Sequence, residues 1–283
     1  MSLAKALRPL EGPSALPGFA PTMTVTLVYL TVVVLVPLAA LVFKASTLGF
    51  GGMLSVATEP RVLASLRVTF GMSIAAALVD LVFGAAIAWT LTRYDFPGRR
   101  LFDAMVDLPF ALPTAVAGIA LSTLYAPNGW LGAALAKFGL KVAYTPWGIL
   151  VALVFVGLPF VVRTVEPIIK VLDREQEEAS ATLGASRWRT LRRVVIPELT
   201  PALLTGVALA FARGVGEYGS VIFIAGNVPY VSEIAPLLIV VKLEEYDYAG
   251  ATAIAAIMLA IAFVMLLAIN AAQAWTRRSL GHV

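Results

Sequence analysis

Residues 178–197 read EASATLGASRWRTLRRVVIP and form the most polar stretch of an otherwise apolar chain. Glu175, Glu177 and Glu178 crowd its start, and arginines fill its second half, which is the order that a helix dipole favours. Gly184 can take the left-handed conformation that ends one helix, Ser186 can cap a second, and Pro197 is expected to end it. The stretch therefore predicts a helix, a turn and a helix between two membrane spans.

The spacing of this stretch resembles the EAA loop of ABC importer permeases. That pattern is Glu-Ala-Ala, three residues, Gly, nine residues, Ile, one residue and Leu-Pro, and the chain matches its spacing throughout. Three positions depart conservatively, because Ser180 stands for Ala, Val194 for Ile and Ile196 for Leu. The resemblance implies a cytoplasmic coupling helix that docks on an ATPase subunit. The implied coupling residues are Glu178, Ala179, Ser180, Gly184, Val194, Ile196 and Pro197. The other interpretation is an ordinary solvated loop.

The composition is that of an integral membrane protein. Of the 283 residues, 60% are hydrophobic and 13% are charged, whereas soluble domains have about 45–50% and about 25%. There is no cysteine, and the single histidine is His282. Disulfides, thiolate metal sites, cysteine nucleophiles and histidine-based sites are therefore excluded. No P-loop pattern is present, so the chain does not bind ATP through such a loop of its own.

The apolar runs predict an all-α membrane protein with six transmembrane helices and a cytoplasmic helix-turn-helix coupling loop. The expected spans are about 23–43, 63–91, 102–124, 147–169, 202–224 and 249–273, with the loop at 173–197 and tails at 1–22 and 274–283. Residues 44–62 are expected to form a polar loop, and 125–146 an outer loop with a short surface helix. Residues 234–241 are too short to cross a bilayer core, which needs about 20 residues, and predict a half-inserted or surface helix.

The distribution of basic residues orients these spans. Thirteen of the 21 Lys and Arg residues fall on the side of the tails and the coupling loop, six on the other side, and two within spans. Because basic residues concentrate in cytoplasmic segments, both termini and the coupling loop are expected in the cytoplasm. This orientation does not use the family resemblance, and it places the loop where an ATPase can reach it.

Longer matches narrow the resemblance to the sulfate/thiosulfate permease family, T subunit. They are LTRYDFPGR at 91–99, DLPFALPTAVAG at 107–118, PFVVRTV at 159–165 and GEYGSVIFIAGN at 216–227. Molybdate permeases share a looser version of several of them.

The resemblance implies a binding-protein-dependent importer in a bacterial-type plasma (inner) membrane. Its partners are a pair of ATP-binding subunits, a related second permease subunit and a soluble sulfate-binding protein, with the lipid bilayer around it and no nucleic acid. No cofactor is expected on this chain, since ATP and Mg²⁺ belong to the partner ATPase. The resemblance also implies that closure of the ATPases moves the coupling helices and turns the spans from inward-facing to outward-facing.

Ionisable residues within spans are candidates for the pathway or its gate, because each is costly there unless it is paired or lines water. Arg213 and Glu217 lie four residues apart and can pair on one helical face. The nearby glycines allow close approach of another backbone or an anion. The candidate pathway residues are Arg213, Gly216, Glu217, Gly219 and Asp80. An equally weighted interpretation is a structural ion pair beside a packing seam.

Two further pairs of charged residues receive structural interpretations. Arg163 and Glu166 predict a pair that reaches toward the interface. Asp103 and Asp107 are expected at a helix N-terminus, where the dipole favours carboxylates. Asp80 needs a partner, for which Arg163 and Arg213 are both candidates. Neutral groups near the spans that suit a sulfate-sized dianion are Thr114, Ser122, Thr123, Ser220 and Asn227.

Several alternatives remain from the sequence. The alternative within the same class is that the chain is a molybdate or tungstate permease. An intramembrane enzyme would need a nucleophile–base pair or metal ligands at depth, and no catalytic or metal residue is visible. A passive anion channel would have no need of the coupling loop. The sequence leaves open the preferred anion, pairing with itself or with a related subunit, the gate residues, and whether the chain holds a discrete anion site.

Overall fold

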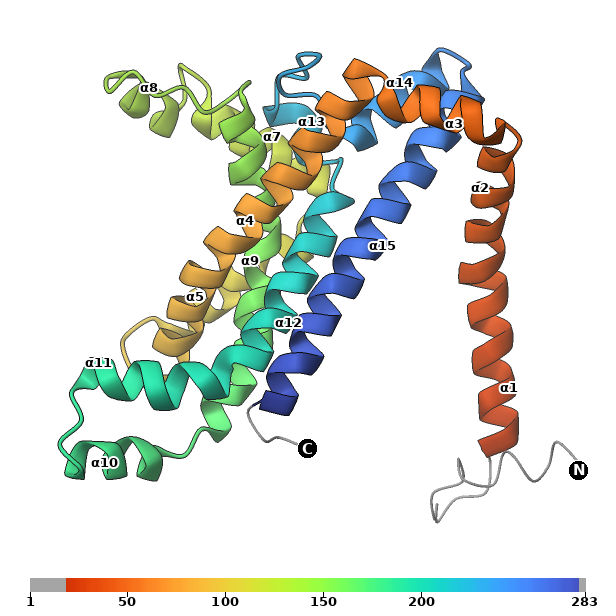
Figure 1. Ribbon diagram of the computed structural model, residues 1–283. Helices are drawn as coiled ribbons and strands as arrows, with labels where there is room; N and C mark the ends of the chain where they lie inside the picture. The colour runs from red at the N-terminus through yellow and green to blue at the C-terminus, as the bar shows by residue number, and fades with distance from the viewer. Residues whose placement is uncertain (1–18, 280–283) are drawn as a thin grey trace, which may run out of the picture.

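The computed structural model describes residues 19–279, and these form helices joined by short connections with no β-strand. Five helical stretches are long and apolar enough to cross a membrane. They are Pro21–Ser46, Pro60–Arg93, Pro146–Val171, Arg187–Val215 and Tyr248–Ala274. The start of α1 and the end of α15 lie at the same end of the molecule as α10 and α11, and α3, α8, α13 and α14 lie at the opposite end (Figure 1). The predicted all-α membrane fold is confirmed.

Three long helices form the centre of the bundle. They are α4 (Pro60–Arg93), α9 (Pro146–Val171) and α12 (Ile196–Val215). Val161 of α9 is fully buried, and a Cβ added at Gly84 of α4 or Gly206 of α12 would press against it. The absence of a side chain at both glycines lets the three backbones approach closely, as small residues do between membrane helices. These helices therefore provide the rigid frame for the rest of the chain.

The first span stands at the edge of this frame. It consists of α1 (Phe19–Leu30), a π-helical turn (Thr31–Leu35) and α2 (Val36–Ser46), and none of its most apolar stretch is buried. Figure 1 shows α1 clear of the bundle. The irregular tail expected through residue 22 ends earlier, because α1 begins at Phe19, and residues 1–18 lie outside the described part. The polar loop expected at 44–62 is wrong, because α3 (Gly49–Thr58) occupies most of it.

The third apolar run, expected as one span at 102–124, is divided into three helices. They are α5 (Arg99–Val106), α6 (Leu108–Ala111) and α7 (Thr114–Tyr125). Leu112 has an extended backbone, the conformation that a following proline favours, and Pro113 precedes the first residue of α7. The two prolines of this run, Pro109 and Pro113, thus mark the starts of short helices. A continuous sixth membrane helix is not found in the described residues.

The second arm of the coupling loop continues into the bundle without a break. α11 (Arg187–Thr190), a π-helical turn (Leu191–Val195) and α12 follow one another. The prediction that Pro197 ends this helix is wrong. The amide of Ile196 donates to the carbonyl of Leu191, five residues back, and this wider turn precedes the proline, whose ring would otherwise crowd the preceding turn. The fifth span therefore starts earlier than residue 202, and its helix ends at Val215 rather than 224.

Short helices cap the opposite end of the bundle. The expected surface helix is α8 (Trp130–Ala136), and the short apolar segment forms α14 (Ala235–Glu244), while α13 (Val221–Ile224) follows the end of α12. α15 (Tyr248–Ser279) then crosses back. Asp247 accepts a hydrogen bond from the Gly250 amide at 2.8 Å, which lowers the pKa of its carboxyl and fixes the start of α15.

Candidate functional site

The coupling loop turns on a glycine in the left-handed conformation. α10 (Arg174–Thr182) begins where the Asp173 carboxylate accepts from the Glu175 amide at 2.9 Å. The helix ends at Thr182, and the turn that follows is formed by Gly184, which has φ +78°. The Gly184 amide donates to the Ala181 carbonyl, and the Ala185 amide donates to the Ser180 carbonyl. This double closure is the Schellman motif, which needs a residue that tolerates positive φ. The turn predicted at Gly184 is confirmed.

A hydroxyl pair joins the two arms of the loop. Ser186 caps α11 by accepting from the Arg189 amide at 3.4 Å, as the sequence predicts. Ser180 Oγ and Thr190 Oγ1 lie 2.8 Å apart, one on each arm. Ser180 is the position at which the chain departs from the alanine of the family pattern, so the departure adds a contact within the loop.

The tip of the loop is exposed and apolar, with charged flanks. Leu183 is 88% exposed and Trp188 is 67% exposed. The α10 arm carries exposed carboxylates, including Glu175 and Glu178, and the α11 arm carries exposed arginines. Figure 1 shows both arms projecting beyond the bundle. Exposed large apolar side chains between charged groups are typical of a surface that another protein covers.

Arg93, which the sequence places only within the family match at 91–99, anchors the base of the loop. It ends α4 and lies over the Trp89 ring at 5.2 Å. Its Nη2 donates to Glu177 Oε1 at 2.7 Å and to the Leu172 carbonyl at 3.2 Å. The pairing joins residues 84 positions apart, which no local pattern indicates. The loop is therefore fastened to the bundle on its α10 side.

The structure brings the predicted coupling residues into one loop, although not into one surface. Glu178, Ala179, Gly184 and Ile196 are exposed, and Ser180, Val194 and Pro197 are partly buried. Val195, between two of the predicted residues, is buried in the core. The first part of the motif is thus presented outward, and the last part joins the loop to α12.

The predicted Arg213–Glu217 ion pair is present at the end of α12. Arg213 Nη2 lies 2.6 Å from Glu217 Oε2. The other oxygen of Glu217 accepts from the amide and the hydroxyl of Ser220, each at 2.8 Å. Glu217 is buried, whereas the Arg213 side chain is 33% exposed. The Arg213 side chain is thus partly exposed, whereas both carboxylate oxygens of Glu217 have partners.

The segment after α12 lies directly against the start of α7. A Cβ added at Gly219 would collide with the Thr114 hydroxyl, and one added at Gly118 would collide with the Ser220 backbone. Gly216 is exposed and has no close neighbour outside its own helix. The glycines therefore have two different roles. Gly219 and Gly118 permit close packing, and Gly216 leaves the backbone beside Arg213 uncovered.

Asp80 has no partner, so the expectation that it pairs with Arg163 or Arg213 is wrong. It is fully buried in α4, and neither carboxylate oxygen has a hydrogen-bond partner. Its Oδ2 fills the space beside Gly157 of α9, where a Cβ would collide with it. Asp80 therefore belongs to a helix seam, and within this conformation it does not face the Arg213 pair.

Arg163 instead binds a cluster of carboxylates on the broken third span. It pairs with Glu166 as predicted, at 2.6 Å, but it also pairs with Asp103 and Asp107 at 2.7 Å each. The helix-dipole interpretation of the two aspartates is therefore incomplete. Asp103 lies inside α5 and Asp107 lies between α5 and α6, so their closest charge is the guanidinium of α9.

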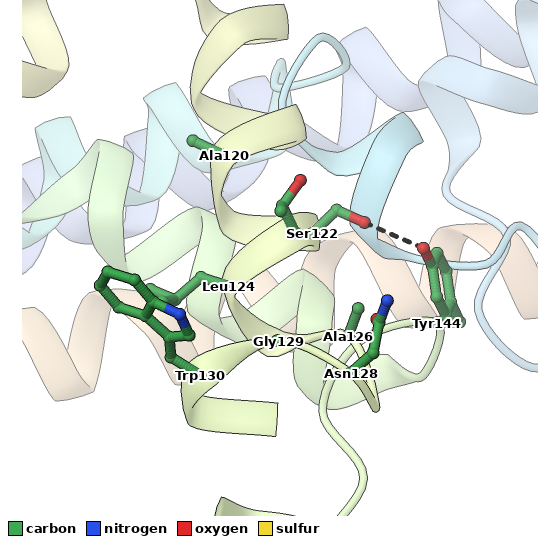
Figure 2. Close-up of a pocket in the computed structure, with 9 residues that line it drawn as sticks. Ala120, Ser122, Leu124, Ala126, Asn128, Gly129, Trp130 and Tyr144 are labelled. Atoms are coloured by element: carbon green, nitrogen blue, oxygen red, sulfur yellow. Dashed lines mark hydrogen bonds between the residues drawn. The ribbon is translucent and has the colours of Figure 1, made fainter. Parts of the chain in front are cut away.

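An open hollow of about 610 Å³ lies at the far end of α7. Figure 2 shows the Ser122 hydroxyl pointing to the phenol of Tyr144, 3.3 Å away, with Asn128 and Trp130 on the wall. Thr123 also lines it. Its lining has no charged side chain, and two of the predicted neutral groups contribute to it. The other three, Thr114, Ser220 and Asn227, lie outside its lining.

Comparison with known proteins decides the family. Residues 80–282 match the family described as "Binding-protein-dependent transport system inner membrane component". The chain belongs to this family. The match covers the coupling loop, the Arg213 pair and Arg163, so the predicted ABC importer permease is confirmed, and the five long apolar helices fit a multi-pass membrane protein.

Relatives of this inner membrane component extend the match over nearly the whole chain. It is 53% identical over 256 residues to a protein of Synechococcus elongatus named "Sulfate transport system permease protein CysT", with 90% of this chain and 92% of that protein covered. It is 48% identical over 268 residues to the protein of the same name from Escherichia coli, with 94% and 97% covered.

Solved structures share the fold at low sequence identity. A bacterial ABC transporter involved in the import of the acidic polysaccharide alginate has a chain that aligns with a TM-score of 0.74 at 16% identity, covering 98% of each chain. The inward-facing MetNI methionine ABC transporter aligns with a TM-score of 0.54 at 19% identity, covering 77% of this chain and 95% of that chain. These likenesses concern the fold alone.

Proposed function

We propose that this chain is the membrane-spanning permease subunit of an ATP-driven sulfate importer and that it couples ATP hydrolysis on a partner subunit to alternating access. The observation that carries the proposal is the projecting loop at Gly184, built on the residues of the EAA pattern in a chain 48–53% identical to proteins named sulfate transport system permeases. ATP hydrolysis belongs to the partner, so the chain itself is not an enzyme.

The proposed assembly contains two ATPase subunits, a related second permease subunit and a soluble sulfate-binding protein in a bacterial inner membrane. The exposed apolar tip of the loop, at Leu183 and Trp188, enters a cleft on one ATPase, and the charged flanks set its orientation. Closure of the ATPases then displaces the loop toward the membrane. Because the loop follows α9 after only two residues and continues without a break into α12, the displacement reaches the bundle.

The Arg213 pair is the proposed anion-facing part of the pathway, with Gly216 uncovered beside it. A lone arginine would hold a dianion too tightly to release it, since conduction requires binding weak enough to allow exit. Glu217 offsets part of the charge, and Arg213 keeps an exposed portion. Gly219 sets the distance between this segment and α7. Asp80, which is sealed within the helix seam, contributes packing in this conformation and takes no part in anion contact.

The coupling role is tested with Gly184→Asp in the full transporter, reconstituted with its ATPase and binding protein. An L-residue at φ +78° strains the turn and the carboxylate adds charge to the docking surface, so ATP turnover is expected to lose its dependence on transport. Gly139→Asp is the matched control, because Gly139 has φ +72°, open space around it and a place in the loop at the opposite end. Equal effects of both variants would refute the docking role.

The substrate is tested by competition. Uptake of labelled sulfate into proteoliposomes is measured against unlabelled sulfate, thiosulfate, molybdate and tungstate. Inhibition by sulfate and thiosulfate at lower concentrations than molybdate supports the proposal. The opposite order favours a molybdate or tungstate permease, the alternative within the same class. Uptake without ATP would indicate a passive channel.

The pathway role is tested at the ion pair. Arg213→Ala is expected to lower sulfate flux and also to leave Glu217 as an unpaired buried charge. The double variant Arg213→Ala/Glu217→Ala removes both charges, so membrane insertion is expected to recover while flux stays low. Normal flux in both variants would show that the pair is structural.

A further inference from the structure

We propose that Arg163 is a positioning residue that fastens the broken third span to α9, so that a displacement of the coupling loop, which reaches Arg213 directly through α12, also reaches its partner Glu217 from the side of α7. The inference rests on the proposed function and adds to it a route through the protein. It names a residue outside both the coupling loop and the candidate pathway.

The tie has an unusually complete geometry. Arg163 Nε and Nη2 donate to the two oxygens of Asp107, at 2.8 and 2.7 Å, which is the bidentate arrangement that fixes both partners in one plane. Nη1 donates to Asp103 Oδ1 at 2.7 Å, and Nη2 also donates to the Asp103 carbonyl at 3.0 Å. One guanidinium therefore holds α5 and the junction between α5 and α6.

The tie lies at a junction within the third span. Asp107 is the residue at which α5 ends and α6 begins, and three-residue turn bonds join it to the two helices, from its amide to the Ala104 carbonyl and from the Phe110 amide to its own carbonyl. One turn from Arg163, Phe160 meets Phe110 of α6 edge to face at 5.1 Å. Both contacts fasten short helices, which have little stiffness of their own, to the long helix α9.

The cluster around Arg163 contains more carboxylates than cations, so the arginine is needed to neutralise them. Arg163 and Lys170 face three carboxylates, those of Asp103, Asp107 and Glu166. Lys170 contacts only Glu166. Without the guanidinium, Asp103 and Asp107 would face each other and Glu166 unneutralised, and α5 and α6 would be repelled from α9.

The tie lies between the loop and the candidate gate. α9 ends at Val171, and after Leu172 and Asp173 the chain enters α10. On the other side, α6 leads through Pro113 to α7, whose first residue, Thr114, lies against Gly219. Glu217 binds Ser220 next to that contact. A displacement of α9 is thereby passed to α5 and α6, then to the start of α7 and the segment after α12 that carries Glu217.

The test separates a transmitting role from simple charge neutralisation. Arg163→Met breaks the tie but leaves the carboxylates to repel one another. Arg163→Met/Asp103→Asn/Asp107→Asn breaks the tie and removes that repulsion, leaving the Glu166–Lys170 pair. Both are measured in the complete reconstituted transporter as sulfate moved per ATP hydrolysed. Arg99→Gln is the control, since it removes an exposed arginine paired with Asp95 in the adjacent turn without touching α9.

The triple variant is expected to assemble and hydrolyse ATP but to move about tenfold less sulfate per ATP, near the upper range of coupling through packed side chains. Arg163→Lys, which keeps one charge but not the bidentate geometry, is expected to fall between it and the wild type. Arg99→Gln is expected to match the wild type. A wild-type ratio in the triple variant overturns the proposal, and if that variant fails to assemble, a wild-type ratio in Arg163→Lys overturns it.

A distance measurement gives a second, independent readout. The chain has no cysteine, so Leu101→Cys on α5 and Val171→Cys at the end of α9, both exposed sites, accept spin labels. The partner subunits are used in cysteine-free form. The distance between the two labels is expected to stay constant through the ATP cycle. When the two cysteine substitutions are combined with the triple variant, the distribution of that distance is expected to broaden. An unchanged distribution in the combined variant refutes the tie. A Gly184→Asp variant that stays coupled would refute the proposed function itself.

Discussion

Glu217 and Asp80 are both buried carboxyl side chains of the same helical bundle, but only one of them has partners. Glu217 receives an ion pair from Arg213 and two hydrogen bonds from Ser220. Asp80 receives no hydrogen bond. The cause is the backbone, because Glu217 follows the end of α12, where the amide of Ser220 is free to donate. Asp80 lies within the continuous helix α4, whose amides bond to its own carbonyls. The end of a helix therefore supplies Glu217 with a backbone donor that Asp80 lacks.

The largest effect is expected from Glu217→Gln. The amide keeps an acceptor for Ser220 but leaves Arg213 without a counter-charge in a partly buried place. We expect a loss of about 3 kcal/mol in stability, the lower end for a broken buried pair because Arg213 is one-third exposed. Thermal unfolding of the solubilised complex measures it. A loss below that of Ser220→Ala would contradict the importance of the charge.

Gly157→Ala tests the Asp80 side of the comparison. The added Cβ collides with Asp80 Oδ2, and a fully buried side chain has little room to move away. Overpacking of this kind is expected to cost about 2 kcal/mol. Combining it with Asp80→Ala should recover most of the loss, which a double-mutant cycle on thermal stability measures. Additive losses would show that the two residues do not share one space.

Ser220→Ala sharpens the description of the Glu217 site. It removes the hydroxyl donor and leaves the amide donor, so the carboxylate keeps two of its three contacts. The expected loss is about 1.5 kcal/mol, as for a hydrogen bond to a charged group. Thermal unfolding beside the wild type gives the value, and Ser232→Ala, at a buried serine in the loop before α14, provides a comparison outside the ion pair.

The smallest effect is expected from Asp80→Asn. Asparagine has nearly the same shape, and no hydrogen bond to the carboxylate is lost. Since an ionised group without a partner is costly in a buried place, the stability should stay within about 0.5 kcal/mol or rise. The result is compared directly with Glu217→Gln in the same assay. A loss as large as that of Glu217→Gln would reveal a partner that Asp80 meets in another conformation.

The parts that the sequence predicts well are governed by neighbours along the chain. Gly184 and Ser186 act through bonds within five residues, and Arg213 meets Glu217 across one helical turn. The helix at 235–244 follows from a run too short to span. Local rules of turns, caps and spacing are sufficient in each case, and the family pattern then gives the loop its meaning.

The parts that the sequence misses depend on choices between distant partners. Arg163 pairs with aspartates 56 and 60 positions away, and Arg93 with a glutamate 84 positions away. Composition identifies such residues as needing partners but cannot choose among several. Pro197 shows a different limit, because the rule that proline ends a helix is bypassed when the preceding turn widens.

The π-helical turn before Pro197 affects the direction in which the α11 arm of the coupling loop leaves the bundle. A helix advances about 100° around its axis with each residue. The π-helical turn holds one residue more than an α-helical turn, so it sets the direction in which Trp188 points around the helix axis. Deleting one residue there would rotate the arm by about a quarter of a revolution. The number of residues in this turn thus orients the proposed docking surface, and deleting a single codon would point it away from the proposed ATPase partner.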